Sequence, residues 1–316
     1  MKIELCKYKG GADSAFTFTF DDGCYLESSR EVLDNFISVY QKYGVKIKAT
    51  VGITVNFMHE ALIDFWKASV KDGYFEIGSH SVGHDLSFSE STPYERREGD
   101  AKSSQLLLKN MFKGEAVETY ILPGGSYDQK GLLPLKDYYI AVRGNKDGIN
   151  YPEKIDWLDI KCFTAMLKRP LEDYTSYIDE VIKGGGWGVQ MNHWITHKSE
   201  DTFHSQGAYS FKDECDYLGK KAQEGDVWVG SFAEVTKYIR RYENSRLSVT
   251  EQNGKLVAEI ITKNDAFLDT PLTISIETDT PIIFYYNGGR GEEIEPIDGK
   301  ILVEVDDFVV FEPKNK

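Results

Sequence analysis

The sequence alternates between short apolar segments and longer amphipathic ones. Residues 15–20, AFTFTF, are typical of a strand, and residues 29–44 follow as an amphipathic helix that ends at Gly44. The same succession recurs about seven times before residue 244. Units of this kind build a parallel sheet covered by helices, and closure into a barrel suits a chain of this length. The pattern therefore predicts an α/β fold, a distorted (β/α) barrel of about seven units.

The pattern changes near residue 245. From there to residue 316, apolar and polar residues alternate in short segments separated by turn signals such as QNG, NGG and IDG. We expect no helix in this part of the chain, and the alternation predicts a small all-β sandwich. The predicted domains are residues 1–244 for the barrel and 245–316 for the sandwich.

Charge and composition narrow the possible partners and compartments. The formal net charge of −14 disfavours binding to nucleic acid or to anionic membranes. No apolar run reaches the roughly 18 residues needed to span a bilayer, and the N-terminus has no apolar core of a signal peptide. We expect a cytoplasmic protein, or a secreted or periplasmic one if a leader has been removed. The four cysteines lie far apart and are expected to be free thiols: Cys6, Cys24, Cys162 and Cys215.

Polar side chains that can do chemistry follow several predicted strands. In parallel α/β folds the working groups lie at the carboxyl ends of the strands, on the loops that lead into the helices. A long loop containing serine and glycine is expected after the last of these strands. We therefore expect one rim of the barrel to collect the polar residues that end these strands: Asp21 and Asp22, His80 and His84, Arg143, and His193.

A carboxylate with two histidines is a ligand set for a divalent transition metal that keeps positions open for water and substrate. His80 and His84 are four residues apart, so one helical turn would place both imidazoles on one face; a polar helix turn without metal is the alternative. Side chains of neighbouring residues in an extended segment point to opposite sides. One of Asp21 and Asp22 can therefore hold a metal while the other accepts a proton from water. A solvated turn is the alternative reading of DDG.

Two motifs resemble those of a known family. TFDDG at residues 19–23, followed by HSVGH at residues 80–84, resembles the first two motifs of the polysaccharide deacetylases, the NodB-homology group of carbohydrate esterase family 4. The resemblance covers roughly residues 10–243. It implies that a divalent ion, usually Zn²⁺ with Co²⁺ or Ni²⁺ as alternatives, is held by one aspartate and two histidines, Asp22, His80 and His84. It also implies that Asp21 is the general base that deprotonates the metal-bound water.

The resemblance extends to three further positions. His193 in QMNH is similar to the histidine that acts as general acid towards the leaving group. Tyr127 in PGGSY is similar to the tyrosine of the third motif, whose backbone N–H stabilises the oxyanion. Asp156 in IDW is similar to the aspartate of the fourth motif, which orients and charges the histidine. The candidate substrate-binding residues are Arg143, Trp187, Trp194 and His197.

One position departs from the family pattern. Leu122 stands where the third motif has an arginine that pairs with the base aspartate. Without a cation beside it, Asp21 would have a less depressed pKa, and the enzyme would be slow or inactive on the usual substrates. Arg143, at the end of the next strand, is a candidate replacement. Binding to substrate or to a helix end is its alternative role.

Together, the residues and the resemblance predict a metal-dependent hydrolase that removes acetyl groups from N- or O-acetylated carbohydrate. Two alternatives stay open: a deacylase or amidohydrolase acting on a small non-polymeric metabolite, and a catalytically weak carbohydrate-binding relative. The complete set of metal ligands, base and acid favours an enzyme, since a binding protein needs neither a base nor an acid. The sequence leaves the oligomeric state open.

Overall fold

The computed structural model describes residues 1–198, 205–263, 267, 269–286 and 289–314. The chain divides into two compact units. Residues Ser14–Thr236 form the first unit, and Met1–Asp13 together with Lys237–Lys316 form the second. Each unit is described by itself below.

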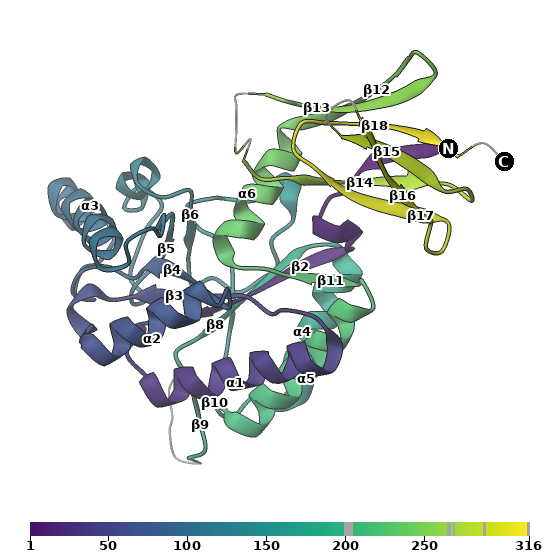
Figure 1. Cartoon of the computed structure of the whole chain (residues 1–316). Coiled ribbons are helices and arrows are strands. Elements are labelled where there is room, and N and C mark those ends of the chain that lie inside the picture. The colour runs from purple at the N-terminus through teal and green to yellow at the C-terminus, as the bar shows by residue number, and fades with distance from the viewer. Residues whose placement is uncertain (199–204, 264–266, 268, 287–288, 315–316) are drawn as a thin grey trace. The chain divides into compact units, whose positions relative to one another are not determined.

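The first unit is built on an eight-stranded sheet in which every pairing is parallel (Figure 1). The strand order is β6-β5-β4-β3-β2-β8-β7, and β11 pairs with β2. A parallel order of this kind gathers the carboxyl ends of the strands at one edge. The strands are β2 (Ser14–Phe20), β3 (Ala49–Ile53), β4 (Phe75–Ser79), β5 (Thr119–Ile121), β6 (Ala141–Arg143), β7 (Phe163–Thr164), β8 (Trp187–Asn192) and β11 (Val227–Val229).

A short stretch of chain joins the two edges of this sheet. Ile160 forms a parallel bridge with Arg143 of β6, and the residues that follow it form β7, which pairs with β8. The backbone N–H of Ile160 donates to the carbonyl of Val142, and that of Gly144 donates to the carbonyl of Ile160. The predicted distorted (β/α) barrel is therefore confirmed. Between β6 and β8 the chain contributes only this bridge and the two residues of β7 to the sheet.

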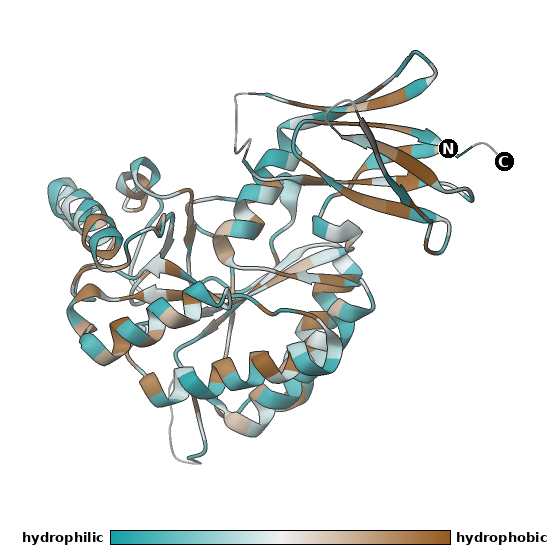
Figure 2. Cartoon of the chain, viewed as in Figure 1, coloured by the Kyte–Doolittle hydropathy of each residue, from teal (hydrophilic) through white to brown (hydrophobic). Residues whose placement is uncertain are grey.

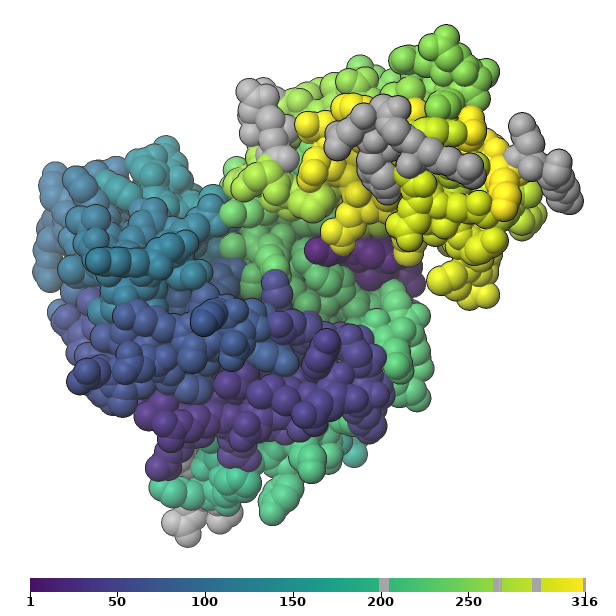
Figure 3. All heavy atoms as spheres, in the orientation of Figure 1, coloured from purple at the N-terminus to yellow at the C-terminus, as the bar shows by residue number. Residues whose placement is uncertain are grey.

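Helices cover the outside of the sheet and supply the core with aromatic side chains. Phe18 of β2 packs against Phe36 of α1 and Phe211 of α5, with ring centroids 5.9 and 5.6 Å apart. Apolar and polar residues are interspersed along α1 and α2 (Figure 2), and these helices cover the side of the unit that faces the viewer in Figure 3. The α-helices are α1 (Leu26–Tyr43), α2 (Glu60–Lys71), α3 (Tyr94–Met111), α4 (Leu171–Gly184), α5 (Ala208–Gln223) and α6 (Phe232–Glu243). The short elements of this unit are η2 (Val55–Phe57), η3 (Leu133–Asp137), η4 (Pro152–Lys154) and the parallel pair β9 (Trp194–Thr196) and β10 (Ser205–Gly207).

Helix α5 lies in the region that the sequence predicts to be a loop, and strand β11 was not expected either. The apolar positions Phe211, Cys215 and Leu218 are buried and have helical spacing. Glu214 is buried in the middle of this stripe, so a charged residue type interrupts the apolar pattern. The prediction was therefore wrong at α5 because a buried polar residue hides the periodicity on which helix prediction depends.

The second unit is β-rich, and it includes the first residues of the chain. Strand β1 (Lys2–Leu5) pairs antiparallel with β14, so residues that the sequence boundary assigns to the barrel lie in the β-rich unit. The sheets are antiparallel, with orders β1-β14-β17 and β12-β13-β18-β15-β16. Sandwich packing of the sheets stays a prediction. The other elements are η1 (Lys9–Gly11), β12 (Ser245–Gln252), β13 (Lys255–Thr262), β14 (Leu272–Glu277), β15 (Ile282–Tyr286), β16 (Gly289–Ile294), β17 (Lys300–Val305) and β18 (Phe308–Pro313).

Three further sequence expectations can be compared with the described part of the chain. All four cysteines are free thiols, as predicted. Among the described residues, no helix combines the length and hydrophobicity that crossing a membrane requires. The described residues after Ser245 contain no helix, which agrees with the change of pattern in the sequence.

A buried polar cluster connects α5 to β8. The carboxylate of Glu214 accepts hydrogen bonds from Nε2 of Gln206 at 2.5 Å and from Nε2 of Gln190 at 3.3 Å, and all three side chains are fully buried. Burial raises the pKa of Glu214 to about 8, although the two hydrogen bonds partly oppose this shift. Glu214 is therefore a neutral acid in the folded protein at pH 7.

Because its pKa is raised on folding, Glu214 lowers the free energy of unfolding as the pH rises from about 4.5 to about 8. Glu214→Gln replaces the neutral acid with a neutral amide of similar shape, so its melting temperature should gain on that of the wild type by about 3 °C or more between pH 5 and pH 8. Thermal unfolding at both values measures this. Glu224→Gln, at the exposed end of the same helix, is the control for the substitution. If the difference in melting temperature between Glu214→Gln and the wild type does not change with pH, Glu214 is not a neutral acid in the folded protein.

Candidate active site

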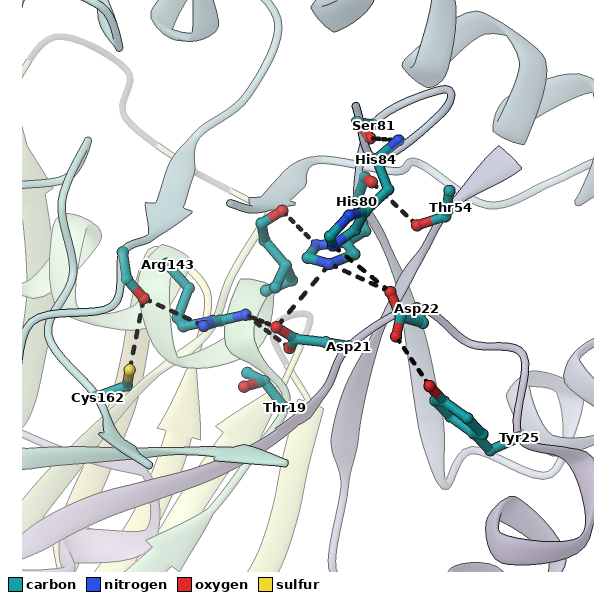
Figure 4. A network of polar contacts seen from close by, with 12 residues as sticks. Thr19, Asp21, Asp22, Tyr25, Thr54, His80, Ser81, His84, Arg143 and Cys162 are labelled. Carbon is teal, nitrogen blue, oxygen red and sulfur yellow. Dashed lines mark hydrogen bonds and ion pairs between the residues drawn. The ribbon is translucent and has the colours of Figure 1, made fainter. Parts of the chain in front are cut away.

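Three potential metal ligands meet at the carboxyl ends of two strands. Asp22 follows β2, while His80 and His84 lie in the loop after β4. Their ligand atoms all lie within 4.8 Å of one another. Nε2 of each histidine is 3.7 Å from Oδ1 of Asp22, and Figure 4 shows both rings turned toward that carboxylate. The rim expected from the sequence therefore brings these three residues together.

The backbone brings these three side chains together in a different way from the one predicted from the sequence. Asp22 has a φ of 70°, so it is in the left-handed region rather than extended, and this turn directs its carboxylate away from that of Asp21. His80 and His84 do not share a helical turn. The loop between them bends through Ser81 at φ 73° and His84 at φ 61°, and the backbone N–H of His84 donates to Oγ of Ser81 at 2.8 Å. Non-glycine residues in this region are uncommon and store backbone strain, which often occurs at functional sites.

The chemistry of the three side chains fits a divalent metal. Nδ1 of the buried His80 lies 2.8 Å from the carbonyl oxygen of Ile121, to which it donates, so the Nε2 lone pair faces Asp22. Burial lowers the pKa of His80 to about 4, which keeps the imidazole neutral. Nε2 of His80 and Oδ1 of Asp22 are both buried and have no hydrogen-bond partner. Buried polar atoms without partners are costly, and a bound cation would satisfy both.

Asp21 is held by an arginine. Nη2 of Arg143 donates to Oδ1 of Asp21 at 2.6 Å and to Oδ2 at 2.5 Å, and both side chains are almost completely buried (Figure 4). Burial alone would raise the pKa of Asp21, but attraction to Arg143, aided by His80 and His193, outweighs it and lowers the pKa. The base candidate is therefore a buried, ionised carboxylate.

Arg143 supplies the guanidinium that pairs with Asp21. The family pattern places an arginine for this purpose at position 122, where this chain has leucine. The backbone N–H of Leu122 donates to the carbonyl of Arg143 at 3.0 Å, so the two residues are neighbours on paired strands. The Leu122 side chain lies in an apolar cluster with Val142 and Leu135. The replacement suggested from the sequence is thus what the geometry shows, whereas the alternative role of Arg143 in binding substrate is wrong because its side chain is fully buried.

His193 lies directly after the strand that pairs with the strand of the base candidate. It follows β8, and the backbone N–H of Asp21 donates to the carbonyl of the preceding residue, Asn192, at 2.8 Å. Attraction to His193 helps to lower the pKa of Asp21. The imidazole is half-buried and lies edge-on to Trp194. The position suits a general acid, and that role stays a prediction.

Tyr127 and Asp156 have partners that the sequence did not predict. The hydroxyl of Tyr127 donates to Oδ1 of Asp159 at 2.7 Å, and Asp159 also pairs with Lys146. Asp156 is exposed and accepts hydrogen bonds from Gln129 and from the backbone N–H of Leu158. None of the contacts described for Asp156 reaches His193, so the expected orienting contact is not found there. The role of the Tyr127 backbone N–H stays a prediction.

The aromatic candidates for substrate binding separate into two groups. Trp187 is fully buried, its Nε1 donates to Oγ1 of Thr17 at 3.0 Å, and its ring packs against Phe232; its predicted substrate-binding role is therefore wrong. Trp194 is half-buried and lies at the rim. His197 is exposed and pairs with Glu31 of α1 at 2.9 Å.

Two residues near the site were missed by the sequence analysis. The hydroxyl of Tyr25 donates to Oδ2 of Asp22 at 3.4 Å, and its ring lies 4.5 Å from that of Trp194. Asp159 holds Tyr127 across Gly144, where a Cβ atom would lie 2.1 Å from Oδ1 of Asp159. Only glycine fits at that position. Tyr25 follows β2, where the rim rule could have found it, whereas Asp159 precedes the bridge at Ile160 and β7, so the rule does not point to it.

Comparison with known protein families finds a match over part of the chain. Residues 9–141 match the family model described as "Polysaccharide deacetylase", a range that contains Asp21, Asp22, His80 and His84. Among curated protein sequences, none matches the chain.

Solved structures that are similar to part of this chain include proteins from three organisms. A polysaccharide deacetylase from Bacillus cereus is 23% identical over 45% of this chain, with a TM-score of 0.35, and the match spans 44% of that protein, under half its length. A family 4 carbohydrate esterase from Streptomyces lividans is 13% identical over 69% of this chain and 93% of its own, with a TM-score of 0.42. A GH57-type branching enzyme from Pyrococcus horikoshii is 8% identical over 70% of each chain, with a TM-score of 0.45. The family match confirms, over residues 9–141, the resemblance of this chain to the polysaccharide deacetylases.

Proposed function

We propose that the protein is a metal-dependent hydrolase that removes acetyl groups from N- or O-acetylated carbohydrate. The observation that carries the proposal is the pair of adjacent carboxylates with different partners. Asp22 faces two histidines, and the buried ligand atoms Oδ1 of Asp22 and Nε2 of His80 have no hydrogen-bond partner, while Asp21 is held ionised by Arg143. The match to the deacetylase family over the same residues supports the substrate class.

Asp22, His80 and His84 would hold the ion, and we propose Zn²⁺, with Co²⁺ or Ni²⁺ as alternatives. A divalent ion in this position lowers the pKa of a water molecule and polarises a carbonyl group. The hydrogen bond from His80 to Ile121 fixes the tautomer and the orientation of that ring.

The protein's own residues supply the proton transfers. Asp21 would accept a proton from the water that attacks the acetyl carbon, and Arg143 orients the carboxylate for this task. When the bond between the acetyl carbon and the sugar nitrogen or oxygen breaks, His193 would donate a proton to that leaving atom. Acetate and a free amine or hydroxyl are the products. We further propose that the Tyr127 backbone N–H stabilises the oxyanion.

The adjacent aspartates give a matched pair of variants. Asp22→Ala should lose both zinc, measured in the purified protein by elemental analysis, and acetate release from acetylated chitooligosaccharides, xylan or muropeptides. Asp21→Asn should keep zinc and lose about 100-fold or more in acetate release, because only the proton acceptor is removed. Full activity in Asp21→Asn would exclude it as the base. Acetate release from small amides alone would favour the small-metabolite alternative.

Arg143 can be tested by moving its charge back to the position that the family pattern uses. Arg143→Leu leaves the buried Asp21 carboxylate without a counter-charge, so kcat should fall by about 100-fold or more. In the double variant Leu122→Arg with Arg143→Leu, a guanidinium returns on the neighbouring strand and should restore part of that loss. Zinc content and thermal unfolding are measured for both variants. An unchanged kcat in a folded Arg143→Leu protein would contradict the positioning role.

A further inference from the structure

The loop that carries His80 and His84 is tied to helix α3 by a carboxylate. The backbone N–H of Val82, midway between the two histidines, donates to Oδ2 of Asp100 at 3.1 Å. Asp100 lies in the second turn of α3, and its other oxygen, Oδ1, accepts a hydrogen bond from the hydroxyl of Tyr120 at 3.2 Å. Tyr120 is fully buried and its ring packs against two other aromatic rings, so its hydroxyl fixes the direction of the carboxylate.

The carbonyl groups of the same loop are bound to η2, the short segment after β3. The backbone N–H of Asn56 donates to the carbonyl of Val82 at 2.9 Å, and that of Val55 donates to the carbonyl of Ser81 at 3.2 Å. Both polar backbone groups of Val82 are therefore occupied, the carbonyl by η2 and the N–H by Asp100. The loop is fixed from two elements of the barrel unit by contacts that include no metal.

The backbone of this loop has a conformation that needs such support. Ser81 and His84, on either side of Val82, have φ angles of 73° and 61°. Non-glycine residues keep such conformations only where the surrounding structure holds them. A carboxylate accepts a hydrogen bond from a backbone N–H more strongly than a neutral group does. The hydrogen bonds described for Asp100 come from Val82 and Tyr120, neither of which is a proposed metal ligand, so Asp100 acts on the site through the loop.

We propose that Asp100 is a positioning residue for the metal site: by accepting the hydrogen bond from Val82, it keeps the loop in the conformation that presents His80 and His84 before an ion binds. The inference rests on the proposed function, since it takes these histidines as metal ligands. A loop that is already ordered loses less conformational entropy when it binds an ion, so the contact raises metal affinity. Groups that orient the ligands of a metal commonly change its affinity by about 10–100-fold.

The alternative is that Asp100 only attaches α3 to the sheet. Glu98 on the same helix provides the comparison, because its Oε1 accepts a hydrogen bond from the hydroxyl of Tyr138 at 3.0 Å. Both acidic side chains are half-buried, and each accepts a hydrogen bond from a tyrosine. The contact described for Glu98 does not involve the loop between the histidines. Truncating Glu98 therefore tests the attachment of the helix without touching the loop.

The test measures zinc affinity in the full-length protein. Chelator-treated protein is titrated with zinc against a chromophoric chelator at one fixed pH. Asp100→Ala should raise the zinc Kd by about 10–100-fold. Asp100→Asn should recover most of the affinity, because the amide oxygen still accepts from Val82 while the Tyr120 hydroxyl can accept from the amide N–H. Glu98→Ala should keep the wild-type Kd.

Thermal unfolding of the metal-free variants separates positioning from a loss of stability. If Asp100→Ala does not fold, the double variant Asp100→Leu with Tyr120→Phe takes its place. It replaces both partners with apolar groups of similar shape and still leaves the Val82 N–H without the carboxylate. A wild-type zinc Kd in the folded variant would overturn the inference. Equal weakening of zinc binding in Glu98→Ala would also overturn it, since that result indicates a general effect of loosening α3.

Hydrogen exchange separates this inference from the proposed function. In the metal-free protein, amides in the peptide covering residues 80–86 should exchange about tenfold or more faster in Asp100→Ala than in the wild type, and Glu98→Ala should leave them unchanged. Faster exchange in a protein whose wild type binds no zinc would support the anchoring of the loop and contradict the proposed metal site. Zinc binding with unchanged exchange and unchanged Kd in Asp100→Ala would support the metal site and contradict this inference.

Discussion

The buried ion pair between Asp21 and Arg143 is the interaction on which the rest of the site depends. Two adjacent carboxylates at the end of one strand would repel each other, and burial would favour protonation of at least one. Arg143, at 2.5 and 2.6 Å, keeps Asp21 ionised and fixes its direction. Asp22 is then left to face His80 and His84. Asp21 and Asp22 are chemically identical neighbours, but the ion pair gives them different surroundings: Asp21 contacts a guanidinium and Asp22 faces two imidazoles.

The backbone around this pair is strained in the places where the ligands converge. Asp22, Ser81 and His84 all have positive φ angles near 60–75°. Each costs about 1–3 kcal/mol, and such conformations persist only where the surrounding structure holds them. Here the parallel strands hold them, since β2 and β4 lie on either side of β3 and deliver both loops to one rim. A metal bound there would repay part of this cost, because it satisfies the unpartnered atoms of His80 and Asp22.

Much of this could be predicted from the sequence because strand ends carry the chemistry in parallel α/β folds. The barrel and the convergence of Asp22, His80 and His84 follow from that rule. The partner of Asp21 could only be suggested, since whether the Arg143 side chain points inward depends on packing. Trp187 was misplaced because it begins β8, at the amino end of the strand, and its side chain is buried in the core.

Long-range pairing and buried polar residues account for the other differences. Strand β1 pairs with β14, more than two-thirds of the chain away, and short local patterns contain no sign of such a partner. The sequence did not predict helix α5, because Glu214 lies within its apolar stripe. Burial keeps this side chain neutral, although a glutamate is ordinarily charged at pH 7. Asp159, which holds Tyr127, precedes β7 rather than following a strand, so the rim rule does not point to it.

Anomalous diffraction at the zinc edge from zinc-soaked crystals tests the central claim most directly. The account predicts one strong peak in the rim, within bonding distance of Asp22, His80 and His84, with Asp21 still bound to Arg143 and not to the metal. A peak elsewhere in the molecule, or a metal that draws Asp21 away from Arg143 as a ligand, would contradict it.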